Sequence, residues 1–198
     1  GAGEAQGHDQ IQVAGSSTLD GTLAITTGGS YSDPTTRAAR DNFTLIASAG
    51  GSTGNFATVS YDGTELSSDF AGDNGSFRAH VGNGLFRNLN YDGNDVSLTN
   101  LFALEGDADG DMDIDITDFN ILASNFDGSG VNSATNNWTT ADFDADGDID
   151  ITDFNFLASN FADSGYGGAE GSQVPEPGSL LLLVLGGVLM GWARKWRN

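Results

Sequence analysis

The sequence predicts a mixed fold: a β-rich N-terminal region, a small α-helical part made of two repeats, and a single apolar C-terminal helix. Three observations predict it. Short apolar runs separated by turn residues fill residues 8–104, a thirteen-residue segment occurs twice further along, and an uncharged run stands near the end. Strands, amphipathic helices and membrane helices respectively produce these patterns.

Composition limits what the chain can bind. Of its 198 residues 28 are acidic and only seven are basic, which gives a formal net charge of −21. Because phosphate contacts need Lys and Arg, we expect no nucleic-acid partner. Twelve of the acidic residues lie in two short loops. So much like charge in one place argues for bound cations. The chain has no cysteine, which excludes disulfides and thiolate metal sites.

The first region, residues 1–104, alternates apolar and polar residues at period two in short runs that end at Gly, Asn, Asp or Ser, a pattern typical of strands. The runs are "DQIQVAG", "GTLAITT", "NFTLIAS", "GNFATVSY", "GSFRAHV" and "YDGNDVSLTNL". Two "YDG" triplets, at 61–63 and 91–93, predict tight turns, and the second predicts a hairpin. This spacing suits a β-sandwich or the end of a β-solenoid, and periodicity does not separate the two.

One part of this region favours the solenoid. The passage "HDQIQVAGSSTLDGTLAI" followed by "FTLIASAGGSTGNFATV" resembles the segments that end β-solenoid passenger regions of exported bacterial proteins. The resemblance implies that residues 1–104 end a larger solenoid whose earlier coils precede Gly1. The chain begins "GAGEAQGHD", without Met or a secretory leader, so we expect a fragment or a processed form.

The thirteen-residue repeat, "IDITDFNILASNF" at 114–126 and "IDITDFNFLASNF" at 149–161, follows an acidic loop in both copies. Residues 142–153, here called loop 2, carry Asp at positions 1, 3, 5, 7, 9 and 12 and Gly147 at position 6. Alternate oxygen ligands with a turning glycine at position 6 are the pattern of a twelve-residue Ca²⁺ loop. Residues 107–118, here called loop 1, fit the same register. The predicted ligands of two Ca²⁺ ions are Asp107, Asp109, Asp111, Asp113, Asp115, Asp118, Asp142, Asp144, Asp146, Asp148, Asp150 and Asp153.

Loop 1 differs from loop 2 at the turn, because Met112 stands at position 6. Met disfavours positive φ, so we expect strain and weaker binding in loop 1. An alternative register aligns Gly110 with Gly147 and recruits Glu105, but it makes the loop two residues longer. We favour the Met112 register because it keeps the spacing into the following helix identical. Position 7 contributes its backbone carbonyl, so Asp113 and Asp148 need not use their side chains.

A short amphipathic helix is predicted after each loop, with an apolar stripe at helical spacing that we expect to pack against its twin. The stripes are Ile116, Phe119, Leu122, Ala123 and Phe126, and Ile151, Phe154, Leu157, Ala158 and Phe161. No comparable stripe precedes either loop. The unit is therefore a loop with an exit helix, and without calcium its crowded carboxylates should leave it loose.

This duplicated loop–helix unit, at 105–165, resembles a type I dockerin, a module related to the EF-hand. The resemblance implies that calcium folds the module, that position 8 (Ile114 and Ile149) packs where the loops meet, and that the helices bind a cohesin. It also places partner contacts at positions 10 and 11, here Ile116, Thr117, Ile151 and Thr152. These residues depart from the Ser-Thr pair best known in that family, so a standard cohesin is in doubt. A calcium-stabilised fold with no protein partner, and a solvated pair of acidic turns, stay open as alternatives.

The C-terminal end follows a Gly-rich linker at 166–177 and contains an uncharged run at 178–193. Trp192, near the end of this run, and Arg194, Lys195 and Arg197, which follow it, mark a membrane boundary. We expect a transmembrane helix with its basic end in the cytoplasm, and a buried core helix is the alternative. Residues 174–198, "VPEP", apolar run and basic end in that order, resemble the PEP-CTERM sorting signal. That resemblance implies processing by an exosortase near Pro175, Glu176 and Pro177, a transient inner-membrane anchor, and a mature protein at the cell envelope, on the cell surface or in an exopolysaccharide matrix.

The sequence shows no catalytic constellation. His8 and His80 lack metal-type or triad-type spacing, and Ser16 and Ser17 lack a nucleophile-elbow context. We therefore expect no enzyme here but a calcium-binding exported surface or matrix protein. The alternative is the non-catalytic end of a secreted polysaccharide-degrading enzyme that docks onto a cohesin-like partner.

Overall fold

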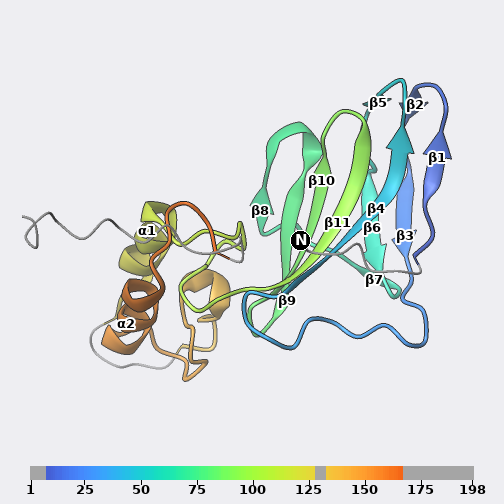
Figure 1. Cartoon of the computed structure of the whole chain (residues 1–198). Helices are drawn as coiled ribbons and strands as arrows, with labels where there is room; N and C mark the ends of the chain where they lie inside the picture. Colours follow the sequence, from blue (N-terminus) through green and yellow to red (C-terminus); the bar gives the residue numbers. More distant parts are fainter. Residues whose placement is uncertain (1–7, 128–132, 167–198) are drawn as a thin grey trace, which may run out of the picture. The chain divides into compact units, whose positions relative to one another are not determined.

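The computed structural model describes residues 8–127 and 133–166 of the chain. Strands occupy the N-terminal part of the described chain, and two α-helices lie close together in its C-terminal part (Figure 1). The predicted β-rich region with two helices after it is therefore confirmed at this level. The predicted transmembrane helix at 178–193 lies outside the described residues.

Eleven strands and two α-helices make up the regular structure of the described residues. The strands are β1 (Ile11–Val13), β2 (Ser17–Thr18), β3 (Thr22–Ile25), β4 (Arg40–Ser48), β5 (Ser52–Thr53), β6 (Thr58–Tyr61), β7 (Thr64–Glu65), β8 (Phe70–Ala71), β9 (Phe77–Gly82), β10 (Leu85–Tyr91) and β11 (Asp95–Phe102). The helices are α1 (Ile116–Asn125) and α2 (Ile151–Asn160), and single 3-10 turns lie at Asp73–Gly75 and Trp138–Thr140.

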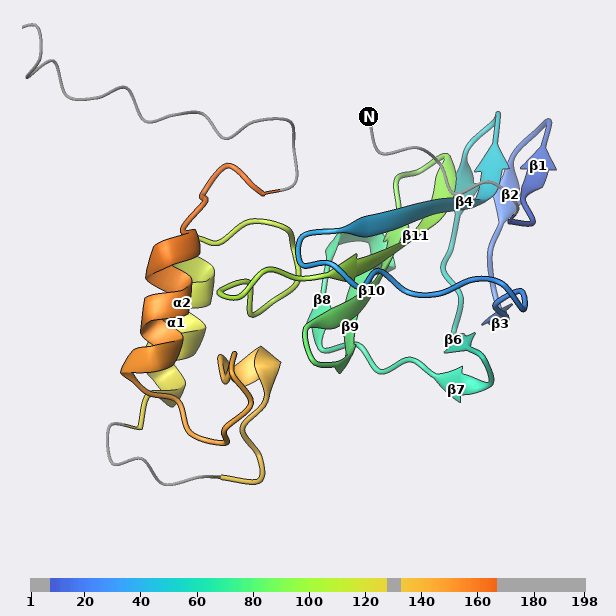
Figure 2. The ribbon, with the colours of Figure 1, turned by 60° about the horizontal axis from the view of Figure 1, so that its bottom comes forward.

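The first six strands form two stacked coils (Figure 2). β1 pairs in parallel with β4, β2 with β5, and β3 with β6, and every partner lies about 35 residues further along the chain. Parallel pairing at one repeated spacing is how solenoid coils stack. The first coil is an edge of all three sheets, since β1, β2 and β3 are each terminal in their strand order.

The second coil is covered by antiparallel strands. β4 pairs with β11, which continues through β10 and β9 to β8. The hairpin predicted at the second "YDG" joins β10 to β11, with Tyr91 opposite Val96. The first "YDG" turns β6 into β7 through Asp62 and Gly63, both at positive φ, as a tight two-residue hairpin loop requires.

Two apolar clusters form the core. One fills the space between the coils and the antiparallel sheet, and it is built on Leu19, Ile46, Val59, Leu89, Tyr91 and Val96. The other joins the far end of β10 and β11 to the loops and helices. It contains Phe86, Leu101, Ala103, Ala108, Ile114, Leu122, Trp138, Ala141, Phe143, Ile149 and Leu157. The second cluster anchors the loop–helix repeats on the sheet.

Candidate metal centre

Each loop ends in a capped helix, and the cap explains why the helix starts there. Asp115 accepts a hydrogen bond from the Thr117 amide at 2.6 Å, and Asp118 accepts one from the Asp115 amide at 2.9 Å. Asp150 and Asp153 repeat both bonds at the start of α2. Carboxylates in a reciprocal capping box also suit the positive end of the helix dipole.

The loops bring ten of the twelve predicted ligands together in equivalent pairs of groups, and the position 5 residues, Asp111 and Asp146, belong to neither group of their loop. Oxygens of Asp107, Asp109 and Asp118 lie within 4.8 Å of one another, and so do those of Asp142, Asp144 and Asp153. These are positions 1, 3 and 12 of each loop. Positions 7, 9 and 12 form a second group in each loop: Asp113, Asp115 and Asp118, and Asp148, Asp150 and Asp153.

The register of loop 1 is the one that aligns Met112 with Gly147. The Met112 amide donates to Asp107 as the Gly147 amide donates to Asp142, at 3.2 and 3.1 Å. Glu105, which the longer register would recruit, instead pairs with Arg37 at 2.8 Å. Met112 has the positive φ, 76°, expected at position 6.

Backbone strain is distributed differently from what the sequence indicates. Besides position 6, each loop has left-handed residues at position 4 and just before position 1. Loop 1 has glycine at both, Gly110 and Gly106, whereas loop 2 has Ala145 at φ 60° and Ala141 at φ 80°. Loop 2 therefore has one glycine among its three left-handed positions and loop 1 has two, which reverses the expected ranking of strain.

Burial makes the carboxylates costly to ionise without a cation. Desolvation, with the nearby Asp118 and Asp109 charges, raises the pKa of Asp107 to about 8. Burial likewise raises the pKa of Asp109 to about 7 and that of Asp118 to about 6. In loop 2 burial raises the pKa values of Asp142 and Asp153. A positive charge close to these carboxylates would favour their ionised form and lower their pKa values.

A carboxylate oxygen in loop 2 is buried with no hydrogen-bond partner. Asp142 is only 4 % exposed, and its Oδ1 is unsatisfied. Oδ1 of Asp148 and Oδ1 of Asp113 are unsatisfied as well. Leaving buried acceptors unpaired is unfavourable, and a hard divalent cation prefers oxygen ligands such as these. The residues present therefore fit Ca²⁺.

Backbone hydrogen bonds at position 8 join the two repeats in an approximately symmetric way. Ile114 of loop 1 pairs with Ala162, which follows α2, through bonds of 3.0 and 3.1 Å. Ile149 of loop 2 accepts from Asp127, which follows α1, at 2.9 Å. Both isoleucines are fully buried. Each loop is thus tied to the end of the other helix.

Two aromatic residues support loop 1, and sequence reasoning missed them. The Trp138 indole donates to the Asp107 carbonyl at 2.6 Å. Tyr166, expected to begin the linker, is half-buried; its hydroxyl donates to the Asp107 carboxylate and accepts from the Leu104 amide. The sequence offered one sign of this role for Trp138, namely that it is the one aromatic residue between the two acidic repeats.

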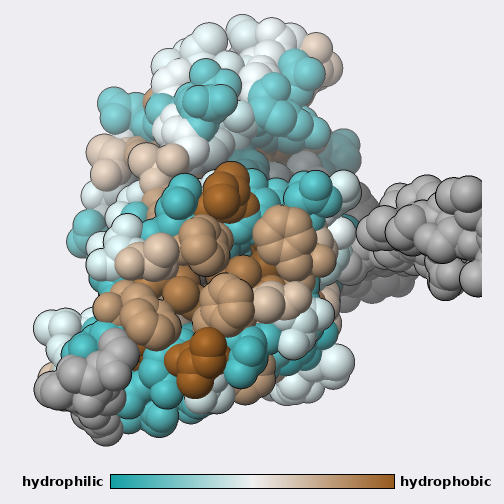
Figure 3. All heavy atoms as spheres, turned by 90° about the vertical axis from the view of Figure 1, so that its left-hand side faces the viewer, coloured by the Kyte–Doolittle hydropathy of each residue, from teal (hydrophilic) through white to brown (hydrophobic). Residues whose placement is uncertain are grey.

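The predicted packing of the helical stripes is wrong in part. Leu122 and Leu157 are buried, but Ile116 is 61 % exposed and Ile151 is 58 % exposed. Phe119, Phe126 and Phe161 are also exposed. The buried side of each helix instead includes the capping carboxylate, Asp118 or Asp153. Figure 3 shows apolar side chains gathered on the face of the molecule that carries the helices.

The predicted partner contacts at positions 10 and 11 lie on this surface. Ile116, Thr117, Ile151 and Thr152 are all exposed. We call the five exposed apolar residues of the two helical ends, Ile116, Phe119, Phe126, Ile151 and Phe161, the helical apolar face.

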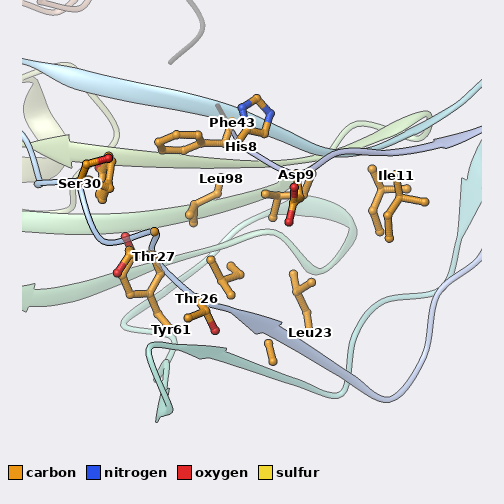
Figure 4. A pocket seen from close by; sticks show the side chains of 16 residues that line it. His8, Asp9, Ile11, Leu23, Thr26, Thr27, Ser30, Phe43, Tyr61 and Leu98 are labelled. Atoms are coloured by element: carbon orange, nitrogen blue, oxygen red, sulfur yellow. The ribbon is translucent and has the colours of Figure 1, made fainter. Parts of the chain in front are cut away.

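A cavity of about 640 Å³ opens between the sheet that contains β1, β4 and β11 and the sheet that contains β3 and β6 (Figure 4). Its walls are largely apolar, with Leu23, Phe43 and Leu98 inside and His8 at its edge. His8 Nε2 lies 3.0 Å from the Thr44 carbonyl. His80, in β9, packs on Phe86, and burial lowers the pKa of its imidazole.

The predicted sorting residues and the predicted membrane boundary lie outside the described part of the chain. The sorting residues are Pro175, Glu176 and Pro177, and the boundary residues are Trp192, Arg194, Lys195 and Arg197. Within 8–127 and 133–166, no helix is both long enough and apolar enough to cross a membrane.

Comparisons with known proteins bear on this C-terminal end. Curated proteins and solved structures gave no match to the chain. Residues 173–197 match the family model described as the PEP-CTERM protein-sorting motif. The chain is therefore an exported, envelope-associated protein that carries the sorting motif processed by exosortase.

Proposed function

We propose that the chain is a non-catalytic surface or matrix protein whose loop–helix repeats, at 105–165, bind two Ca²⁺ ions. The single observation that carries this is the buried, unpaired Oδ1 of Asp142, in the residue whose carboxylate lies within 4.8 Å of those of Asp144 and Asp153. Asp144 and Asp153 already accept hydrogen bonds from backbone amides, so a cation among the three carboxylates would offset their like charge and satisfy Oδ1 of Asp142.

The two loops would supply carboxylate oxygens from positions 1, 3, 5, 9 and 12 and a carbonyl from position 7. Calcium supplies positive charge that offsets the repulsion and the burial cost. Because the helices begin at position 10, fixing the loop also fixes α1 and α2. Calcium would thus stabilise the module in the manner of a dockerin, to which the repeats are similar.

The test is a calcium titration of the chain, followed by calorimetry and circular dichroism. We expect two binding events, and a melting temperature that rises between chelator and millimolar calcium, since a ligand of the folded state stabilises it. Asp153→Asn should remove one event. Unchanged melting and no binding heat would refute the proposal.

The helical apolar face favours a second function, docking of a cohesin-like protein. Five large apolar side chains stay exposed on helices whose other side is buried, although burying them would be favourable. Ile116 and Ile151 occupy the same position in the two repeats, so each helix offers an equivalent exposed side chain. This arrangement also fits the alternative in which the chain is the non-catalytic C-terminal part of a secreted polysaccharide-degrading enzyme that docks onto a cohesin-like partner through these helices. A pull-down with cohesin modules that Ile116→Ser with Ile151→Ser abolishes would support it; equal capture by both forms would not.

We also infer that the stacked coils end a longer β-solenoid. β1, β2 and β3 leave one ladder edge each unpaired among the described residues, and the cavity of about 640 Å³ opens beside β3. A preceding coil at the same spacing would pair those edges and close that cavity. Appending such a coil should raise the melting temperature, whereas no change would contradict this reading.

A further inference from the structure

Arg78 brings a positive charge into loop 1 from the β region. Its guanidinium lies 3.0 Å from Asp109 Oδ2 and 3.9 Å from Asp111 Oδ2. These carboxylates occupy positions 3 and 5 of loop 1. Asp144, the position 3 residue of loop 2, is exposed, and the ion pairs of the described chain include none with it. Arg78 therefore distinguishes loop 1 from loop 2.

The arginine is held by the sheet rather than by the loop. Arg78 lies in β9 opposite Phe70 of β8, and its guanidinium stands 5.5 Å from the Phe70 ring. Next to it, the buried Asn88 amide donates to the Gly110 carbonyl at 2.8 Å. A Cβ added to Gly110 would come within 2.5 Å of the Phe86 ring. Loop 1 is thus fixed against β9 and β10 with Arg78 directed at its carboxylates.

We infer that Arg78 is a built-in counter-cation of loop 1, which competes with Ca²⁺ and couples calcium binding to the β region. The inference rests on the calcium function proposed above. Both oxygens of Asp109 are already engaged, Oδ2 by Arg78 and Oδ1 by the Asp111 amide at 3.2 Å. Calcium must either displace the guanidinium or bind beside a fixed positive charge, and both lower its affinity.

The coupling acts in both directions. If Arg78 lowers the calcium affinity of loop 1 by some factor, bound calcium weakens the Arg78 ion pairs by the same factor. Calcium in loop 1 thereby loosens the contact between β9 and the loop. Loop 2 has no ion pair with Arg78 and should bind calcium independently of this arginine.

The experiment measures each site alone by calorimetric calcium titration of the full chain. Asp153→Asn removes site 2 and leaves loop 1; Asp118→Asn removes site 1 and leaves loop 2. In the first background Arg78→Gln should tighten calcium binding about tenfold, a typical size for coupling between sites, and Arg78→Lys, which keeps the charge, should change it less. In the second background Arg78→Gln should have no effect.

If Arg78→Gln left the calcium affinity of loop 1 unchanged, the inference would be overturned while two-site binding of the unmodified chain stayed intact. An unmodified chain that binds no calcium would instead overturn the proposed function. Should Arg78→Gln fail to fold, hydrogen exchange of the unmodified chain gives a second test. Calcium should speed exchange of the β8–β9 amides relative to β10–β11, and unchanged exchange would also count against the inference.

Discussion

At the scale of single residues, the two loops balance ligands against backbone strain in different ways. Met112 is held at positive φ, but it also packs on the core, and its sulfur accepts from Arg40 at 3.1 Å. Ala145 is held at positive φ without such compensation, since it is exposed. A left-handed residue with a Cβ costs roughly 1–2 kcal/mol. Relief of strain should therefore be larger at Ala145.

Ala145→Gly should raise the free energy of unfolding by about 1 kcal/mol, because glycine adopts φ 60° without a steric penalty. Met112→Gly should give less or a net loss, since the packing of Met112 disappears with the strain. Urea denaturation in chelator measures both. A stabilisation by Met112→Gly that exceeded that of Ala145→Gly would show that turn strain alone governs the loops.

At the scale of elements, the exposed and buried positions of each helix should respond differently. Leu122 is 2 % exposed and belongs to the core, so Leu122→Ala should cost about 3 kcal/mol of unfolding free energy. Ile116→Ser removes a side chain that is 61 % exposed, and it should cost less than about 0.5 kcal/mol. Chemical denaturation measures both losses of unfolding free energy. Similar losses in the two variants would mean that the predicted apolar stripe, Ile116 included, is packed after all.

The contact between loop 1 and β10 gives a second prediction at this scale. Gly110→Ala should cost about 2 kcal/mol or more, because the new Cβ meets the Phe86 ring and φ is 72°. Position 4 of loop 2 is Ala145, so an alanine at this position is compatible with the loop itself, and the additional cost in loop 1 comes from the contact with Phe86. Thermal melting with and without calcium measures the loss. A melting temperature equal to that of the unmodified chain would mean that loop 1 does not dock on β10 in solution.

The elements could be predicted from sequence where local pattern decides, and not where long-range packing decides. The duplicated Asp spacing predicted both loops and the start of α1 and α2. Strand runs with clear alternation predicted β1, β3, β4, β6, β9 and β11. The two-residue strands β2, β5, β7 and β8 have too few residues to show a period. Ile116 and Ile151 of the helical apolar face were named as partner contacts only through the dockerin resemblance. The apolar pattern alone placed them in a packed stripe, because the same i, i+3, i+7 spacing describes a stripe that packs inside and one that stays outside.

At the scale of the whole molecule, pH and calcium should oppose each other. Because the pKa of Asp107 is raised from 3.8 to about 8, this residue binds more protons in the folded calcium-free chain than in the unfolded chain between those values. The contribution of Asp107 to stability is then complete below about pH 4 and is lost as pH rises towards 8. Asp109 and Asp118, with raised pKa values of about 7 and 6, act in the same direction.

In chelator, the chain should melt at a higher temperature at pH 5 than at pH 8. In millimolar calcium the order should reverse, since calcium binds the ionised carboxylates and the gain grows as protons leave. Differential scanning calorimetry at both pH values checks this. His80, whose pKa is lowered by burial, acts in the opposite direction over this range. A calcium-free chain that gains stability steadily from pH 5 to pH 8 would therefore show that His80 outweighs the loop carboxylates.

The hydroxyl bond between Tyr166 and Asp107 has a mechanical meaning in an envelope-associated protein. The sorting motif begins at residue 173, shortly after Tyr166. Tyr166 also donates its amide to the Met112 carbonyl, and Ala162 pairs with Ile114. Tension applied through the C-terminal end of the chain would therefore enter the described fold at loop 1 and act first on Asp107, the ligand proposed at position 1. Loop 1 would then be the first part of the described fold to unfold under tension, and the calcium proposed there would raise the force that it withstands.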